Sequence, residues 1–277
     1  MLWERRILLE ADRRGLLRIV VARPQPWPFE VTLNLGLALV LAGRGYRILH
    51  AGGLAHGGAC LAILGPPGAG KSSLILAGAR QDLEVVSDEI LPFRRRARAF
   101  YCPGSNPTIH IDTHLLEGKP SEVARGPAAG AGGAERKVSI DVRRLGGRAA
   151  PGPSRLAALI FLGRRLGHRG PAYRLEPLRP AEALVGLLDN TYNSRIQGTA
   201  ERRRHLEICA AAARALPAYR LRVREGIGNI QAAARGCRDL LIPQGVVAAA
   251  GSRPAAAPGP LRSARPRRER RPEPPRL

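Results

Sequence analysis

A glycine-rich octapeptide follows directly on a continuous apolar segment, and this junction constrains the fold more than any other part of the chain. The apolar segment is Ala59–Leu64 (ACLAIL), and the octapeptide is Gly65-Pro66-Pro67-Gly68-Ala69-Gly70-Lys71-Ser72. An apolar run without polar alternation is typical of a strand that is buried on both faces. Residues 72–79 have a helical composition. The sequence therefore predicts a strand, a glycine loop and a helix in succession.

The octapeptide fits the pattern GxxxxGK[ST], whose chemistry is phosphate binding. Glycines let consecutive backbone N–H groups curl around an anion, and the start of the helix adds its partial positive charge. Lys71 can reach the β- and γ-phosphates, and the Ser72 hydroxyl can bind Mg²⁺. With only three lysines in 277 residues, this composition gives about 0.002 accidental matches. We predict that the octapeptide and Ser73 bind a nucleotide phosphate.

Two polar residues outside the loop are candidates for chemistry. Asp88 follows a short apolar run at residues 83–86, and we expect it at the C-terminal edge of the strand adjacent to the loop strand, facing the same crevice. A carboxylate there could act as the base for an attacking hydroxyl, although Asp is also a common turn cap. His50 starts the predicted strand hairpin 48–64; taken alone, such a histidine is more often a surface or core residue.

Together these features resemble the catalytic domain of HPr kinase/phosphorylase and the broader group of HPr-kinase-related serine kinases. The resemblance covers roughly residues 45–240. Its main pieces are Leu49-His50-Ala51, the buried strand, the glycine loop and Val85-Val86-Ser87-Asp88-Glu89. The weaker downstream pieces are Cys102–Ile109, Lys137–Asp141, Leu159–Leu162 and Leu188–Tyr192.

The resemblance implies an α/β protein with a mixed sheet, on the P-loop kinase fold of the HPr kinase and phosphoenolpyruvate carboxykinase type. It also implies ATP with Mg²⁺, and transfer of the γ-phosphoryl group to a serine hydroxyl of a peptide or protein. Asp88 would be the general base, and His50 would lie beside it and tune its protonation. Lys71 would act on the transferred group. Ser72, Asp88 and Glu89 would hold the metal.

A second basic group would contact phosphate from the opposite side of the site. Lys137 and a nearby arginine, Arg136 or Arg143, are the candidates, and the alternative for Lys137 is an exposed strand residue. Shorter members similar to this chain are associated with peptide natural products: some phosphorylate the C-terminal serine of a lasso-peptide precursor, and others act on free serine. Family members are often homo-oligomers. Two other classes stay open: a P-loop ATPase or regulatory nucleotide-binding module, and a nucleic-acid-associated ATPase.

The net charge of +23 suits an acidic peptide substrate but does not by itself indicate nucleic acid. Joint enrichment in Arg, Ala, Gly and Pro is typical of a GC-rich genome. The sequence has no helix-turn-helix spacing, zinc finger or RNP aromatics, so nucleic-acid binding is the less favoured class. The four cysteines are widely scattered and form no CxxC pair, which predicts buried thiols in a reducing compartment.

Composition divides the chain into three predicted parts. Residues 1–47 form a short strand-rich segment packed on the core, residues 48–245 form the P-loop kinase core, and residues 246–277 form a disordered tail. The end of the chain, residues 252–277, holds eight arginines and seven prolines, a composition that cannot build a packed core. The apolar run 31–42 is too short to cross a membrane, and residues 1–14 lack the pattern of a signal peptide. We therefore expect a cytoplasmic protein with no membrane association.

Overall fold

The computed structural model describes residues 7–11, 17–21, 36–104, 107–112, 137–192 and 198–242. The chain divides into two compact units, Met1–Gln244 and Gly245–Leu277, and all the described residues lie in the first. The predicted tail 246–277 and Arg136 lie outside the described residues, as does the side chain of Lys137. The predicted boundaries at residues 47 and 245 stay predictions.

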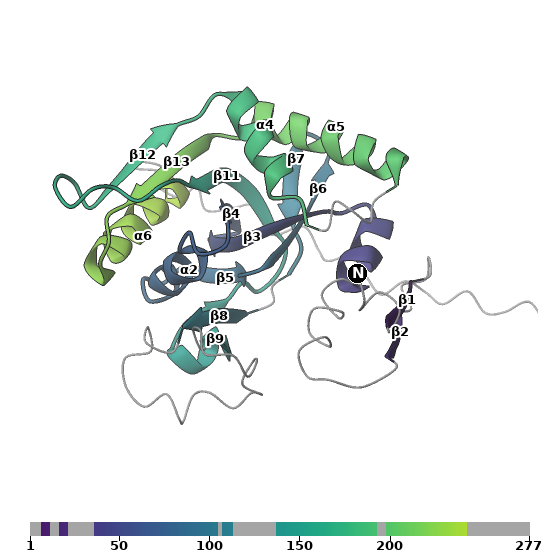
Figure 1. The fold of residues 1–277 in the computed structure, drawn as a ribbon, viewed down its shortest axis with the longest axis horizontal. Coiled ribbons are helices and arrows are strands. Elements are labelled where there is room, and N and C mark those ends of the chain that lie inside the picture. The colour runs from purple at the N-terminus through teal and green to yellow at the C-terminus, as the bar shows by residue number, and fades with distance from the viewer. Residues whose placement is uncertain are drawn as a thin grey trace, which may run out of the picture. The chain divides into compact units, whose positions relative to one another are not determined.

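A nine-stranded mixed sheet organises the described part of the chain (Figure 1). Its order is β10-β5-β3-β6-β7-β11-β13-β12, and β4 pairs with both β3 and β11. The β4–β11, β11–β13 and β10–β5 pairs are parallel, whereas β3 runs antiparallel to β4, β5 and β6. The prediction of a mixed α/β sheet is confirmed. The strands are β3 (Arg47–His56), β4 (Ala59–Leu64), β5 (Glu84–Ser87), β6 (Ile90–Arg96), β7 (Ala99–Cys102), β10 (Arg148–Ala149), β11 (Ser154–Leu162), β12 (Tyr173–Pro177) and β13 (Ala218–Val223).

Two smaller antiparallel ribbons accompany the sheet. They are β1 (Ile7–Ala11) with β2 (Leu17–Val21), and β8 (Thr108–Asp112) with β9 (Lys137–Asp141). The first ribbon lies within the N-terminal segment 1–47, for which strands are predicted. Residues 36–43, which overlap the apolar run 31–42, are helical.

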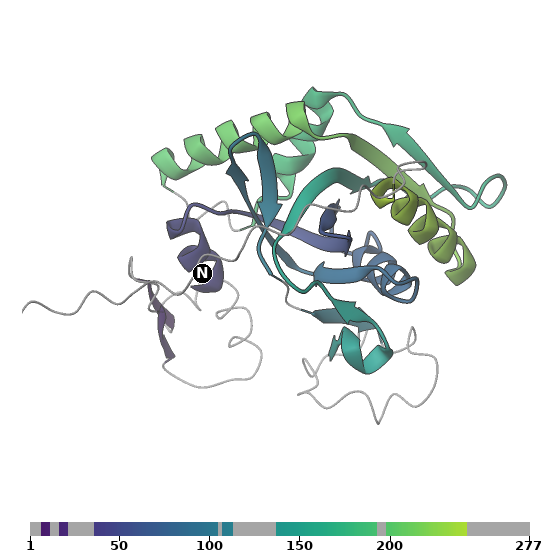
Figure 2. The same cartoon turned by 180° about the vertical axis from the view of Figure 1, so that it is seen from behind.

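Helices cover both faces of the large sheet. The helices are α2 (Lys71–Ala79), α4 (Pro180–Asp189), α5 (Thr199–Ala215), α6 (Ile227–Leu241) and the short 3-10 helix η2 (Val142–Leu145). Helices α2 and α6 pack on one face, and α4 and α5 pack on the other (Figures 1 and 2). Each helix pair buries its own apolar cluster against the strands.

Strand β4 is buried on both faces, as its unbroken apolar sequence predicts. Leu61 and Ile63 belong to the cluster under α2 and α6, whereas Cys60, Ala62 and Leu64 belong to the cluster under α4 and α5. Side chains alternate across a strand, so a central strand between two helical layers needs apolar residues at every position. The hairpin that leads into β4 turns at glycines 57 and 58, both with left-handed φ angles of 56° and 78°.

The expected adjacency of the loop strand and the strand before Asp88 is wrong. Strand β3 lies between them, paired with β4 on one side and with β5 on the other. Because β3 is antiparallel to both, β4 and β5 still run in the same direction and end at the same edge of the sheet. Their carboxyl-terminal loops can therefore meet, although the strands themselves do not pair.

The cysteines behave as the sequence predicts: all four are buried free thiols. Burial raises the pKa of Cys209 and of Cys237 to about 12. Within the described ranges, no helix combines the length and the apolar character needed to cross a membrane.

Candidate functional site

The loop between β4 and α2 adopts the conformation that its glycines allow. Gly68 and Gly70 have φ angles of 77° and 95°, in the left-handed region that favours glycine, and a Cβ at either position would enter open space. Gly70 is the N-cap of α2, and no side chain caps the helix or adds an acidic group to its first turn. The partial positive charge of this helix start is therefore available to an anion.

Lys71 is held over the loop by backbone carbonyls. Its Nζ donates hydrogen bonds to the carbonyl oxygens of Gly65 at 2.6 Å and Pro66 at 3.3 Å, and only 8% of the residue is exposed. A lysine restrained in this way keeps its ammonium beside the backbone of the loop. The local sequence thus brings a cation and a helix start to one point.

A cavity of about 790 Å³ opens beside the loop, at the edge of the sheet where β4, β5, β11 and β13 end. Most of the residues that the sequence singled out line it together. They are His50, Pro67, Gly68, Ala69, Gly70, Lys71, Ser72, Ser73, Asp88 and Glu89. Gly65 and Pro66 lie at the base of the loop and do not line the cavity.

Asp88 is the most buried ionisable group of this cavity. Its side chain is 1% exposed, and Oδ2 accepts a hydrogen bond of 2.7 Å from the backbone N–H of His110. Among the described residues, Oδ1 is buried without a hydrogen-bond partner. Burial raises the pKa of Asp88; the His110 amide, the Ser72 side chain and the charges of His110 and Lys71 oppose that rise. A buried acceptor with spare capacity thus faces the loop.

The imidazole in contact with Asp88 belongs to His110, which the sequence did not single out. Its Nδ1 lies 3.9 Å from Asp88 Oδ2, and 28% of its side chain is exposed. His110 sits in β8 between two buried isoleucines, so strand alternation turns it toward the cavity. The contact joins residues 22 positions apart, so no local sequence pattern indicates it.

His50 lines the same cavity from β3. Its backbone N–H donates to the carbonyl oxygen of Asn190 at 2.7 Å, and its ring stacks on Tyr192 with centroids 6.4 Å apart. Burial, and then the charge of Lys71, lower the pKa of His50. This environment favours the neutral form of the His50 imidazole.

Asn190 ties the loop to His50. Its Oδ1 accepts a hydrogen bond of 3.1 Å from the backbone N–H of Gly65, and its Nδ2 donates to the carbonyl oxygen of Gly186 at 2.8 Å. Since its own carbonyl receives the His50 amide, one residue at the end of α4 fixes both the start of the loop and the imidazole strand. The residue stands in a segment that the family resemblance includes, but its role is visible only in the fold.

Among the described side chains, Arg143 does not supply the second basic group predicted at the phosphate site. Arg143 lies in η2, where its Nε donates to both carboxylate oxygens of Asp141 at 2.9 and 3.0 Å, and it does not line the cavity. The pair is exposed, and Arg143 lowers the pKa of Asp141. The basic groups that do line the cavity besides Lys71 are His50, His110, Arg165 and Arg224.

The oxygen donors in the cavity fit Mg²⁺ better than a metal ion that takes all its ligands from protein side chains. Within the part of the chain that is described, no group of three or more His, Cys, Asp and Glu residues could hold a metal ion. The cavity offers the Ser72 hydroxyl and the carboxylates of Asp88 and Glu89. Mg²⁺ usually keeps several waters and binds through one or two carboxylates and substrate phosphates. The buried Oδ1 of Asp88 is an acceptor that a cation would satisfy.

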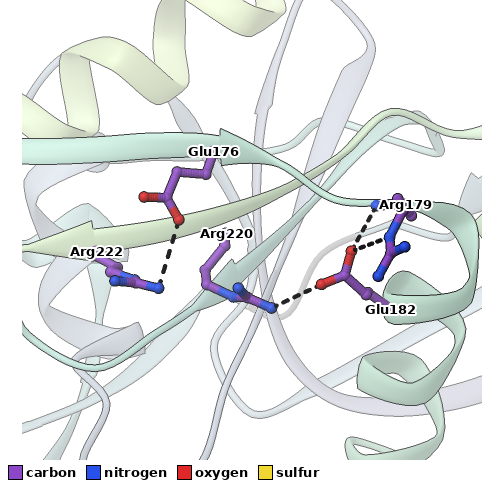
Figure 3. A network of polar contacts seen from close by, with 5 residues as sticks. All are labelled: Glu176, Arg179, Glu182, Arg220 and Arg222. Carbon is purple, nitrogen blue, oxygen red and sulfur yellow. Dashed lines mark hydrogen bonds and ion pairs between the residues drawn. The ribbon is translucent and has the colours of Figure 1, made fainter.

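Ion pairs on the other face of β13 keep its arginines away from the cavity (Figure 3). Arg220 pairs with Glu182 at 3.4 Å, and Arg222 pairs with Glu176 at 3.6 Å. Glu182 also receives Arg179 at 3.2 Å. Because side chains alternate along the strand, Leu221 and Val223 face the cavity instead.

The chain is similar to a solved structure of a kinase/phosphatase. That structure is of the Hpr(Ser) kinase/phosphatase from Coxiella burnetii, which is 16% identical, with 69% of this chain and 96% of that chain covered and a TM-score of 0.36. At this TM-score the likeness does not establish a shared fold. No protein-family model matches the chain, and no curated protein matches it in sequence.

Proposed function

We propose that the protein is an ATP-dependent kinase, on a P-loop kinase fold of the HPr kinase and phosphoenolpyruvate carboxykinase type. It transfers the γ-phosphoryl group to a serine hydroxyl of a peptide or protein. The observation that carries the proposal is the shared cavity: the buried carboxylate of Asp88, with an acceptor oxygen to spare, faces the loop that holds Lys71 and the start of α2. A phosphate site alone would support only nucleotide binding.

The loop and its lysine position the triphosphate. Backbone amides at the start of α2 and the ammonium of Lys71 bind phosphate oxygens, where negative charge grows as the bond to the leaving oxygen lengthens. Ser72, Asp88 and Glu89 would hold Mg²⁺, which would neutralise part of the phosphate charge. Lys137, predicted on the opposite side, adds a second cation.

Asp88 takes the proton of the acceptor. The serine oxygen forms a bond to the γ-phosphorus, the bond to the β–γ bridging oxygen breaks, ADP leaves with that electron pair, and the hydroxyl proton passes to Asp88. A raised pKa suits this role, because a base is most effective when its pKa lies near the working pH. His110 contacts the same carboxylate, and His50, which lines the same cavity, is proposed as a second group that tunes the protonation of Asp88.

The acceptor proposed is an acidic peptide with a serine, in particular the C-terminal serine of a lasso-peptide precursor. A net charge of +23 favours association with a negatively charged partner. The proposal places the enzyme in the cytoplasm, without membrane association and as a homo-oligomer. Nucleic acid is not its partner.

Phosphate transfer can be tested with γ-labelled ATP and Mg²⁺. Purified protein is incubated with a set of serine-containing peptides, including acidic peptides that end in serine, and with random DNA. Label on a peptide serine that Asp88→Asn abolishes while ATP binding persists is the expected result. Release of phosphate to water without labelled peptide would favour an ATPase, and stimulation of that release by DNA would favour a nucleic-acid-associated ATPase. Equal transfer by wild type and Asp88→Asn refutes the assignment of the base.

A further inference from the structure

A group of arginines lies at the edge of the sheet opposite the cavity. Arg94 in β6 pairs with Tyr101 in β7, and Tyr101 pairs with Arg155 in β11. Arg155 stands at the start of β11, about 20 Å along the strand from Leu162, which lines the cavity at its other end. Both views show the hairpin of β6 and β7 on the side away from α2 (Figures 1 and 2). These arginines are therefore separate from the site described above.

Strand alternation places these side chains on the outer face of the sheet. Directly opposite residues share a face, and the neighbours of each along its own strand are buried. These buried neighbours are Phe93, Phe100, Cys102, Ser154 and Leu156. Arg96 follows Arg94 by two positions on the same face, and Arg98 lies in the hairpin turn; both are exposed, as is Arg155. The four residues Arg94, Arg96, Arg98 and Arg155 are here called the hairpin patch.

No carboxylate within the described ranges pairs with the hairpin patch. The ion pairs of this part of the chain include none of its four arginines. The sequence agrees, because residues 90–111 and 142–175, which contain the patch, hold neither Asp nor Glu. Other exposed arginines do have such partners: Arg143 pairs with Asp141, and Arg203 pairs with Glu207. The hairpin patch is thus a cluster of like charges that the described protein does not neutralise.

We infer that the hairpin patch binds an acidic segment of a protein or peptide. The inference goes beyond the proposed function and does not depend on it, because the patch lies apart from the cavity. A guanidinium group binds a carboxylate through two parallel hydrogen bonds, and a cluster of like charges attracts an oppositely charged partner. Arg94 and Arg96 are two positions apart on one strand, roughly 6.7 Å. Alternate residues of an extended acidic segment have the same spacing, so their carboxylates can meet both arginines.

The aromatic residues around the patch favour an acidic protein segment over nucleic acid. Single-stranded nucleic acid is bound by stacking its bases on exposed aromatic rings. Tyr101 is half-buried between Arg94 and Arg155, and the guanidinium carbon of Arg94 lies 4.8 Å from the ring centroid of Tyr46. In the part of the chain that the structure describes, no aromatic side chain is exposed. The patch therefore offers charge for carboxylates without a surface on which bases could stack.

Binding of a fluorescent oligo-glutamate peptide to the full chain tests the inference, and the assay contains no ATP. The patch variant combines Arg96→Gln, Arg98→Gln and Arg155→Gln, three exposed positions. It should bind the peptide about fivefold or more weakly than wild type, because three exposed ion pairs with the peptide are lost and each is modest. Equal affinity of the patch variant and wild type overturns the inference. Failure of phosphate transfer in the assay proposed above would leave it intact.

A control variant with the same change in net charge separates the patch from the charge of the whole chain. It combines Arg144→Gln, Arg214→Gln and Arg235→Gln, which are exposed positions on η2, α5 and α6. Its affinity for oligo-glutamate should differ from that of wild type by less than about twofold. Equal losses in the two variants overturn the inference, because the peptide would then respond to net charge alone.

Two further readouts identify the partner and the place of binding. Oligo-glutamate that carries a benzophenone group should label residues 94–101 or 153–157 of wild-type protein on irradiation. Label confined to residues 245–277, or to any other segment, overturns the inference. Single-stranded DNA of equal charge should bind more weakly than oligo-glutamate. Tighter binding of DNA that is lost in the patch variant would assign the patch to nucleic acid and overturn the inference.

Discussion

Asn190→Ala is the substitution whose effect can be worked out in most detail. It removes the acceptor of the Gly65 N–H, and Gly65 is buried. The carbonyl of Gly186 loses the Asn190 Nδ2 donor but still accepts from the Asn190 backbone N–H at 3.2 Å. The dominant loss is therefore a single buried, unsatisfied donor, which costs about 1–3 kcal/mol. For a protein of this size, that loss lowers Tm by roughly 2–12 °C.

The same substitution should weaken nucleotide binding, because Gly65 is the first residue of the loop. Without this hydrogen bond the loop amides shift relative to the phosphates that they bind. We therefore expect ATP affinity to fall about tenfold or more. Thr191→Ala is the control: it removes the contact between Thr191 Oγ1 and His205 Nε2 at 2.8 Å, a neighbouring polar contact that does not touch the loop. Thermal unfolding and calorimetric titration with ATP would show both variants less stable but only Asn190→Ala impaired in binding. An Asn190→Ala protein with wild-type Tm and wild-type affinity refutes the role of this residue.

Two further predictions concern buried ionisable groups. Burial raises the pKa of Asp88 above 3.8, so the folded state loses stability as the pH rises above 3.8. Asp88→Asn should therefore unfold at a higher denaturant concentration than wild type at pH 7, and at the same concentration near pH 3. A variant less stable than wild type at pH 7 would contradict this. Burial, with the charge of Arg47, lowers the pKa of His205 from 6.5 to about 4, so the stability of the folded state should fall as the pH drops from 6.5 toward 4. In denaturation experiments across this range, His205→Gln should lose less stability than wild type. An identical pH profile of the two proteins would exclude His205 as the cause.

Local sequence was sufficient to predict the elements that carry the loop. The apolar run of β4 and the glycines after it each have a signature within a few residues, and the structure places them where expected. Strand β12 has no such signature, because its alternating Arg174 and Glu176 and its partial exposure give no apolar run. Such edge strands are defined by their partner rather than by their own composition.

The site was only partly predictable, because its decisive contacts join distant parts of the chain. The amide of His110 reaches Asp88, and the side chain of Asn190 reaches Gly65 across 125 positions. The pairing of β5 with β3 rather than with β4 likewise depends on tertiary packing. A motif can therefore indicate the phosphate site, whereas the groups that orient it follow from the fold.

Titration of wild-type protein and Lys71→Met with ATP and Mg²⁺ tests most directly whether the loop binds a triphosphate. Lys71 is the cation held over the loop by the carbonyls of Gly65 and Pro66, and methionine preserves its apolar stem while removing its charge. We predict saturable binding by wild type and a loss of at least about tenfold in Lys71→Met, measured at a temperature at which both proteins are folded. Absence of ATP binding by folded wild-type protein, or equal affinity in the two proteins, would contradict the assignment of this cavity as a nucleotide site.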